Sequence, residues 1–215
     1  KFPSIPGFNI NEATDVLLKR DFDKYRAIGE PHPFLVANDR DFLIPFKHEH
    51  FELWTQSLHF GAKDRLNFVH TNTNLKVGGG LDDVWLNIDT NCLHIVDYKS
   101  TSQKSDKGPI TLDDFWKASY KRQMDLYVWV LSKKGFHVDD VGYFLYCDGD
   151  RFSDYDFLSS TMASMNFKMT LIEYQTNDSW IEPTLNGISE CLHESKRPDH
   201  SDRCEYGKFL AQILN

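Results

Sequence analysis

The sequence has no run of apolar residues long enough to cross a bilayer, and its first residues show no signal-peptide pattern. It also has no Cys-x-x-Cys pair, because its four cysteines are widely spread. These absences argue against a membrane-spanning protein and against a disulfide-rich secreted scaffold. We therefore expect a cytoplasmic protein with reduced thiols and without a membrane partner.

An excess of positive charge is absent too. The chain carries 24 Lys and Arg against 32 Asp and Glu, a formal net charge of −8. General nucleic-acid binders usually have a basic footprint, so the sum argues against such a protein. Two considerations soften this argument: carboxylates that hold metal ions add negative charge that bound cations neutralise, and local charge matters more than the sum.

Two apolar-rich segments flank a short polar break at residues 89–91. The first covers Val77–Trp85 and contains three consecutive glycines followed by Leu-Asp-Asp. The second covers Leu93–Ser100 and contains Ile-Val-Asp-Tyr-Lys. Such segments around a short turn predict an antiparallel β-hairpin. The glycine run also suggests backbone left bare for the close approach of a ligand.

The register of this hairpin decides which charged side chains share a face. A two-residue turn at Thr90–Asn91 pairs Asp82 with Lys99. Because side chains alternate along a strand, Asp82, Asp97 and Lys99 then share one face, and Asp83 points away. A slip of one residue would exchange the two aspartates.

Two acids and a lysine on one sheet face have two explanations. Buried carboxylates need a cation, a proton or a hydrogen-bond network, and a hard divalent ion such as magnesium suits their oxygens. The alternative is a solvated face on which Asp and Lys pair weakly. The apolar Ile95 and Val96 directly before Asp97 favour a site.

Residues 111–134 carry the start and stop signals of a long helix. Thr111 stands at the N-cap, acids occupy the first turn, bases occupy the last, and Gly135 follows. An otherwise apolar and aromatic stripe is formed by Trp116, Tyr120, Gln123, Tyr127 and Val130. The polar ends of Gln123 and Tyr127 could address a phosphate or orient Lys99; alternatively, both residues only pack at the edge of the core.

The ordered set Gly-x-Leu-Asp, hydrophobic-Asp-Tyr-Lys and Gln-x-x-x-Tyr resembles the RecB-like branch of the PD-(D/E)XK nuclease superfamily, which includes CRISPR adaptation nucleases. The resemblance implies an α/β fold with a PD-(D/E)XK restriction-endonuclease-like α-β-β-α-β core, a mixed central sheet flanked by helices. We expect a single nuclease-like domain over residues 1–215, with its core at about 9–148 and a C-terminal strand and helical elaboration at 149–215.

The resemblance also implies the activity: a divalent-metal-dependent exonuclease that hydrolyses DNA phosphodiester bonds in repair, recombination or defence. Asp82 and Asp97 would ligate the metal, and Lys99 would position or activate the attacking water. Gln123 and Tyr127 match the motif that the family uses near the DNA backbone. The DNA partner would be single-stranded or a duplex end, and a helicase or nuclease-complex partner stays open.

Two further ligands to Mg²⁺ or Mn²⁺ follow from the resemblance. One is the backbone carbonyl of Tyr98. The other lies on the helix before the hairpin, where the family carries an acid or histidine and this chain has Asp15. Glu12 is a rival for that place, and a solvent-facing Asp15 is a third possibility.

Some relatives bind an iron–sulfur cluster through one cysteine before the core and three after it. The cysteines of this chain are Cys92, Cys147, Cys191 and Cys204. Because no cysteine precedes Cys92, we expect no iron–sulfur cluster.

Two other functions remain open. The chain could be a catalytically inactive nuclease-fold binding or scaffold module, or a phosphoesterase acting on other nucleic acid or on nucleotides. The loop 99–108, with Lys117, Lys121 and Arg122 beyond it, could meet a phosphate backbone, or it could be merely solvated.

Periodicity and turn signals predict the remaining elements. They are helices over 11–29, 48–60 (with Trp54 and Leu58 inward), 178–194 and 205–214, and strands over 141–147 and 166–175, with irregular chain over 30–45.

Overall fold

The computed structural model describes residues 9–58, 63, 65–104, 108–196 and 198–214. The chain divides into two compact units. The first comprises Lys76–Asp178 and the chain before His70, and the second comprises His70–Leu75 and the chain after Asp178. Among the described residues, no helix is long and apolar enough to cross a membrane.

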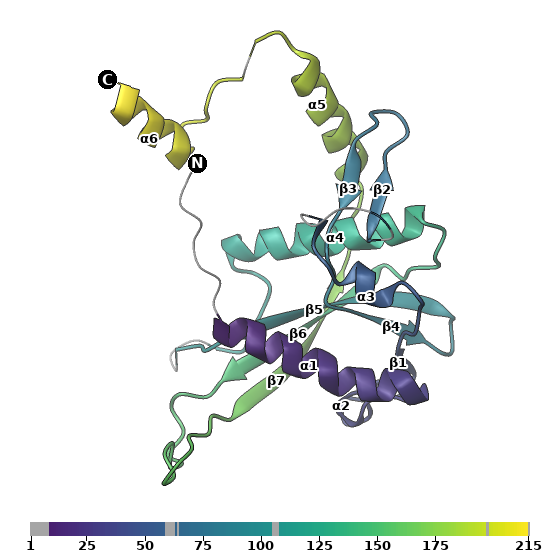
Figure 1. Ribbon diagram of the computed structural model, residues 1–215, viewed down its shortest axis with the longest axis vertical. Helices are drawn as coiled ribbons and strands as arrows, with labels where there is room; N and C mark the ends of the chain where they lie inside the picture. Colours follow the sequence, from purple (N-terminus) through teal and green to yellow (C-terminus); the bar gives the residue numbers. More distant parts are fainter. Residues whose placement is uncertain (1–8, 59–62, 64, 105–107, 197, 215) are drawn as a thin grey trace. The chain divides into compact units, whose positions relative to one another are not determined.

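The first unit is an α/β structure. Its described residues form a five-stranded sheet in the order β1-β4-β5-β6-β7 (Figure 1). The sheet is mixed, because β5 and β6 run parallel while the other neighbours run antiparallel. Its strands are β1 (Leu43–Pro45), β4 (Asp83–Asn87), β5 (Cys92–Thr101), β6 (Val141–Gly149) and β7 (Phe167–Gln175). The predicted mixed central sheet flanked by helices is thereby confirmed.

Helices pack on both faces of this sheet (Figure 1). On one face, Phe22 of α1 (Asn9–Ile28) packs into a buried cluster with Trp85, Val96 and Tyr98. On the other, α4 (Ala118–Lys133) carries Met124 against Gly142 of β6, so close that a β-carbon at residue 142 would clash. Shorter elements complete the unit: α2 (Pro33–Val36), α3 (Phe51–Trp54), and the antiparallel pair β2 (Asn67–Val69) and β3 (Lys76–Gly78).

The turn of the central hairpin differs from the prediction. Asn87 pairs with Cys92, so the turn spans the four residues 88–91 instead of the two residues Thr90–Asn91. The Asn87 side-chain oxygen accepts the N–H groups of Asp89 and Thr90 at 3.0 and 3.1 Å, which stabilises the wider turn. Asn91 closes it at a φ of 56°, in the left-handed region that asparagine tolerates.

The register is therefore shifted by two residues, and the predicted pairing of Asp82 with Lys99 is wrong. Asp83 pairs with Val96. A shift of two preserves the alternation of faces, so Asp83 points to the side opposite Asp97, as predicted. The error in the turn leaves the assignment of faces intact.

The long helix begins later than predicted. A 3₁₀ turn covers Phe115–Lys117, and α4 follows it. Buried Lys117 donates to the Thr111 carbonyl at 2.5 Å and pairs with Asp114 at 2.9 Å, which stabilises a non-helical path over 111–114. The same contacts remove Lys117 from the predicted basic strip. The end is as expected, with Gly135 at a φ of 93°.

Other elements follow the sequence signals to different degrees. The strand predicted over 166–175 and the helices predicted over 11–29 and 205–214 are found as β7, α1 and α6 (Glu205–Leu214). Helix α5 (Ile181–His193) is shorter than predicted, and β6 is longer. Within 48–60, α3 is the only α-helix among the described residues, and Leu58 has a 3₁₀ conformation. Trp54 is buried, Leu58 is half-buried, and residues 59–60 lie outside the described part. Strand β1 lies in the segment expected to be irregular.

Candidate active site

The structure brings Asp15, Asp82, Asp97 and Lys99 together at one place in the first unit. Asp97 and Lys99 stand two residues apart on β5, and their side chains form an ion pair. Asp82 lies directly before β4, where its Oδ2 accepts the backbone N–H of Tyr98 at 2.8 Å. Asp15 reaches the group from α1. The residues predicted from the hairpin and from the preceding helix thus converge.

A small cavity of about 130 Å³ lies among these residues. Asp15, Lys19, Asp82 and Tyr98 line it, together with Val16, Thr55 and Leu81. Asp97 is not among the lining residues and is paired with Lys99. The carboxylates of Asp15 and Asp82 therefore lie beside one small open cavity, close to the Tyr98 backbone.

The electrostatics of the group show a shortage of positive charge. Burial, with repulsion from Asp82, raises the pKa of Asp15 to about 6. Burial and the same repulsion raise the pKa of Asp97 to about 7, although Lys99 acts in the opposite direction. Burial also raises the pKa of Asp82. The three carboxylates share the charges of Lys99 and Lys19, so their full ionisation would be favoured by a further cation.

The donor set fits a hard divalent ion. Carboxylate oxygens suit magnesium and manganese, which usually keep waters as their other ligands. Asp15 Oδ1 is buried and accepts no hydrogen bond from any described residue, so it has a free lone pair beside the cavity. In the described part of the chain, no three His, Cys, Asp or Glu side chains are grouped closely enough to hold an ion by themselves. Water, the Tyr98 carbonyl or a substrate phosphate would have to complete the shell.

The structure separates the rival candidates on α1. Asp15 is half-buried and lines the cavity, whereas Glu12 is exposed. The repulsion that Asp15 receives from Asp82 is larger than that from Glu12. Of the two acids, Asp15 is therefore the one that belongs to the site.

Gln123 and Tyr127 hold the segment that leads into Asp82. Gln123 Nε2 donates to the Tyr127 hydroxyl at 3.0 Å, and that hydroxyl donates to the Gly80 carbonyl at 2.7 Å. A β-carbon at Gly79 would lie 2.7 Å from the same hydroxyl. The glycine run thus makes room for Tyr127, which corrects the expectation of backbone left bare for a ligand.

Lys19 is a member of the site that the sequence analysis missed. It follows Asp15 by one helical turn, and its Nζ donates to Thr55 Oγ1 at 2.8 Å. It lines both the small cavity and a neighbouring cavity of about 740 Å³, and its charge lowers the pKa of Asp82. Its spacing of four residues from Asp15 is the signal that could have identified it.

Comparison with protein-family models, with curated proteins and with solved structures finds no match to this chain.

Proposed function

We propose that this chain is a divalent-metal-dependent nuclease of the PD-(D/E)XK type that hydrolyses DNA phosphodiester bonds. The observation that carries the proposal is the cluster of Asp15, Asp82 and Asp97 beside Lys99, whose pKa values are raised by burial first and by repulsion among carboxylates second. The order of these residues along the chain, followed by Gln123 and Tyr127, agrees with the motif order of that superfamily. DNA repair, recombination or defence, and attack from DNA ends, belong to the same proposal.

Each residue has a defined task in this proposal. Asp15 and Asp82, which line the cavity, and Asp97, once released from Lys99, would hold Mg²⁺ or Mn²⁺, with the Tyr98 carbonyl as a further oxygen ligand. The three carboxylates would have to draw closer together than they stand in this structure. When bound, the ion lowers the pKa of water and offsets the negative charge that develops on the phosphate.

Lys99 would place its ammonium group beside the nucleophile or the scissile phosphate, exchanging its contact with Asp97 for one with substrate. As a fixed cation it can act in its ordinary charged form. Gln123 and Tyr127 keep the Gly80 carbonyl, and with it the approach to Asp82, in place.

The test is incubation of linear and circular DNA with manganese or magnesium. We expect metal-dependent degradation by the wild type, and Asp97→Ala or Lys99→Ala should reduce the rate by at least about 10²-fold with an unchanged circular-dichroism spectrum. Asp41→Asn is the matched control, because Asp41 is exposed and far along the chain from the site residues. Cleavage at the wild-type rate by both Asp97→Ala and Lys99→Ala would rule the proposal out.

One observation favours a second candidate, a nuclease-fold binding or scaffold module without turnover. Lys99 is closed onto Asp97, which compensates one of the carboxylates without a metal ion. Magnesium titration by calorimetry followed by the cleavage assay separates the two. The binding module predicts no metal-dependent cleavage of single-stranded DNA, duplex DNA, RNA or mononucleotides.

The 740 Å³ cavity next to Lys19 favours a third candidate, a phosphoesterase acting on nucleotides, because its volume is typical of small-molecule sites. Faster hydrolysis of mononucleotides than of polymers in the same substrate panel would identify that activity.

A further inference from the structure

Aromatic rings lead away from Lys99 along the start of α4. Lys99 Nζ lies 4.6 Å from the centroid of the Tyr120 ring. Tyr120 in turn meets Trp116 edge to face, with the ring centroids 5.5 Å apart and the ring planes at 87°. Trp116 is 54% exposed, an unusual state for the largest apolar side chain. The solvent-accessible ring of Trp116 is thus connected to Lys99 through a single residue, Tyr120.

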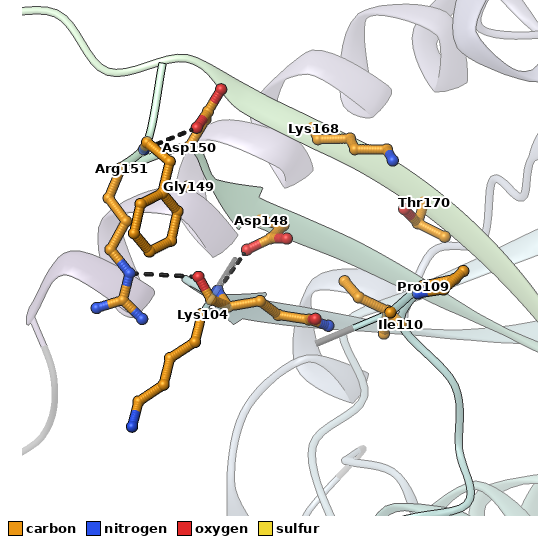
Figure 2. A pocket seen from close by; sticks show the side chains of 12 residues that line it. Lys104, Pro109, Ile110, Asp148, Gly149, Asp150, Arg151, Lys168 and Thr170 are labelled. Carbon is orange, nitrogen blue, oxygen red and sulfur yellow. Dashed lines mark hydrogen bonds between the residues drawn. The ribbon is translucent and has the colours of Figure 1, made fainter. Parts of the chain in front are cut away.

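Two adjoining cavities continue from Trp116. The nearer, of about 300 Å³, is lined by Trp116, Lys104 and Arg151 among others. The farther, of about 600 Å³, shares Lys104 and Arg151 and adds Phe152 and Lys168. Figure 2 shows the farther cavity, where Lys104, Arg151 and Lys168 come from three different segments. The two cavities share Gln103, Lys104 and Arg151 and therefore adjoin, and we call the pair, with Trp116 and Phe152 on their walls, the route.

Charges along this route favour an anion. Lys104 and Lys168 are exposed, and neither forms an ion pair with a described residue. The acids on the same walls already accept hydrogen bonds from the chain. Asp148 accepts the Gln103 N–H at 2.9 Å, and Asp150 accepts the Phe152 N–H at 3.0 Å. The ammonium groups are therefore available to a ligand.

Arg151 fixes the geometry of the route. Its guanidinium donates to the carbonyls of Ser102 and Gln103, at 2.6 and 3.2 Å, and so holds the chain after β5 beside the start of the β6–β7 connection. The next residue, Phe152, is 54% exposed, so a second accessible ring stands at the far end. The walls of the two cavities therefore carry two exposed aromatic rings and two exposed lysines, the groups that bind bases and phosphates respectively.

We infer that a single-stranded nucleic acid lies along the route from Lys99 over Trp116 to Phe152, with bases stacked on the two rings and phosphates at Lys104 and Lys168. The inference rests on the proposed function, because it names the form in which substrate reaches Lys99. Exposed rings bind unstacked bases, whereas the bases of a duplex are stacked on each other. A duplex would use the lysines alone.

The test measures binding without cleavage, by fluorescence anisotropy of the full chain in EDTA. Labelled oligodeoxyuridine and oligouridine, which differ only in the sugar, are compared with a duplex of the same length. We expect either single strand to bind at least tenfold more tightly than the duplex, and the tighter of the two identifies the sugar. Trp116→Ala should weaken single-strand binding about tenfold, and Trp116→Phe should restore most of it.

The lysines are tested through salt dependence. The double variant Lys104→Ala/Lys168→Ala should reduce the slope of log K against log salt by about 1.4, whereas Lys76→Ala, at an exposed lysine on β3, should leave it unchanged. Unaltered binding by both the Trp116→Ala and the double-lysine variant would overturn the inference, as would equal affinity for duplex. A thermal melt of each variant shows that it is folded.

Failure of this inference is distinct from failure of the proposed function. Metal-dependent cleavage with unaltered binding by these variants would leave a nuclease with a different substrate path. Ring- and lysine-dependent binding without cleavage would leave the path in place and point to a binding module.

Discussion

Asp82 and Asp83 are neighbours in the sequence, yet they occupy opposite environments. Asp83 is fully buried, and it receives the Arg26 guanidinium at 2.5 Å, the Tyr98 hydroxyl at 2.6 Å and the Val84 N–H at 2.7 Å. Asp82 receives one backbone N–H, and the charges of Lys99 and Lys19 act on it together with those of neighbouring carboxylates. The protein thus compensates the charge of Asp83 by direct contacts with its own groups, whereas the burial of Asp82 is compensated less completely, which agrees with the proposed metal site.

This difference separates a structural carboxylate from a functional one. Arg26 is itself satisfied, since it also donates to Asp23 and to the Phe46 carbonyl. A buried charge network of this kind stabilises when complete and is costly to break. Around Asp82, by contrast, burial and repulsion among the carboxylates disfavour their ionised forms, and under the proposed function a bound cation would relieve this. The largest change in stability is therefore expected when the complete network around Asp83 is broken.

Asp83→Ala should lower the free energy of unfolding by about 3–5 kcal/mol, because it leaves the buried Arg26 charge without its main partner. Urea denaturation measures the change. Asp82→Asn, in EDTA at pH 8, is the matched variant and should cost little or raise stability. Equal losses of unfolding free energy in the two variants would contradict the distinction between Asp83 and Asp82.

If magnesium binds beside Asp82, it should compensate the charge of the carboxylates there and so stabilise the native state. A ligand at a hundred times its dissociation constant stabilises the native state by about 2.7 kcal/mol. We expect a gain of about that size for the wild type at pH 8, measured as a rise in melting temperature. Asp82→Asn should abolish most of the gain, while the Asp41→Asn control should keep it. An equal gain in Asp82→Asn would place the ion elsewhere.

The smallest expected effect is a pH dependence from Asp15. Its folded pKa of about 6 lies above the ordinary value of 3.8, so the native state binds more protons than the unfolded chain between these pH values. In EDTA, stability should fall as the pH rises through that interval. Asp15→Asn should be more stable than the wild type by about 1 kcal/mol at pH 8, after allowance for solvent screening of this half-buried group.

At pH 4 the difference between Asp15→Asn and the wild type should vanish, because the wild-type carboxyl is then largely protonated. Thermal melts at the two pH values check this. A difference that is constant with pH would show that Asp15 is not held in a repulsive environment.

The sequence predicted much of the site because its motif residues are close together along the chain. Asp82, Asp97 and Lys99 were identified from a hairpin. The face on which each side chain lies depends only on alternation along the strands, so the error of two residues in the turn did not change the assignment of faces. Lys19 was missed because a lysine on an amphipathic helix looks like any solvated residue. Its significance depends on Thr55, which is distant in sequence.

The errors in the predicted elements also arise from contacts that local sequence does not reveal. The helix start at Ala118 depends on the buried contacts of Lys117 with Thr111 and Asp114, which override the local capping signal. Strand β1 has only three residues and ends in Pro45, so neither length nor composition predicts it. It exists because it pairs with β4 at the sheet edge. Tertiary contacts decide both cases.

The bond between Asp82 and the main chain of residue 98 has a consequence for how the site tolerates mutation. Its donor is an amide that nineteen amino acids possess and proline lacks. Exchanging the phenol of Tyr98 for another side chain would weaken the Asp83 network, while the amide that orients Asp82 would persist. Substitution of Tyr98 should therefore lower the stability of the fold while leaving the orientation of the Asp82 carboxylate largely unchanged.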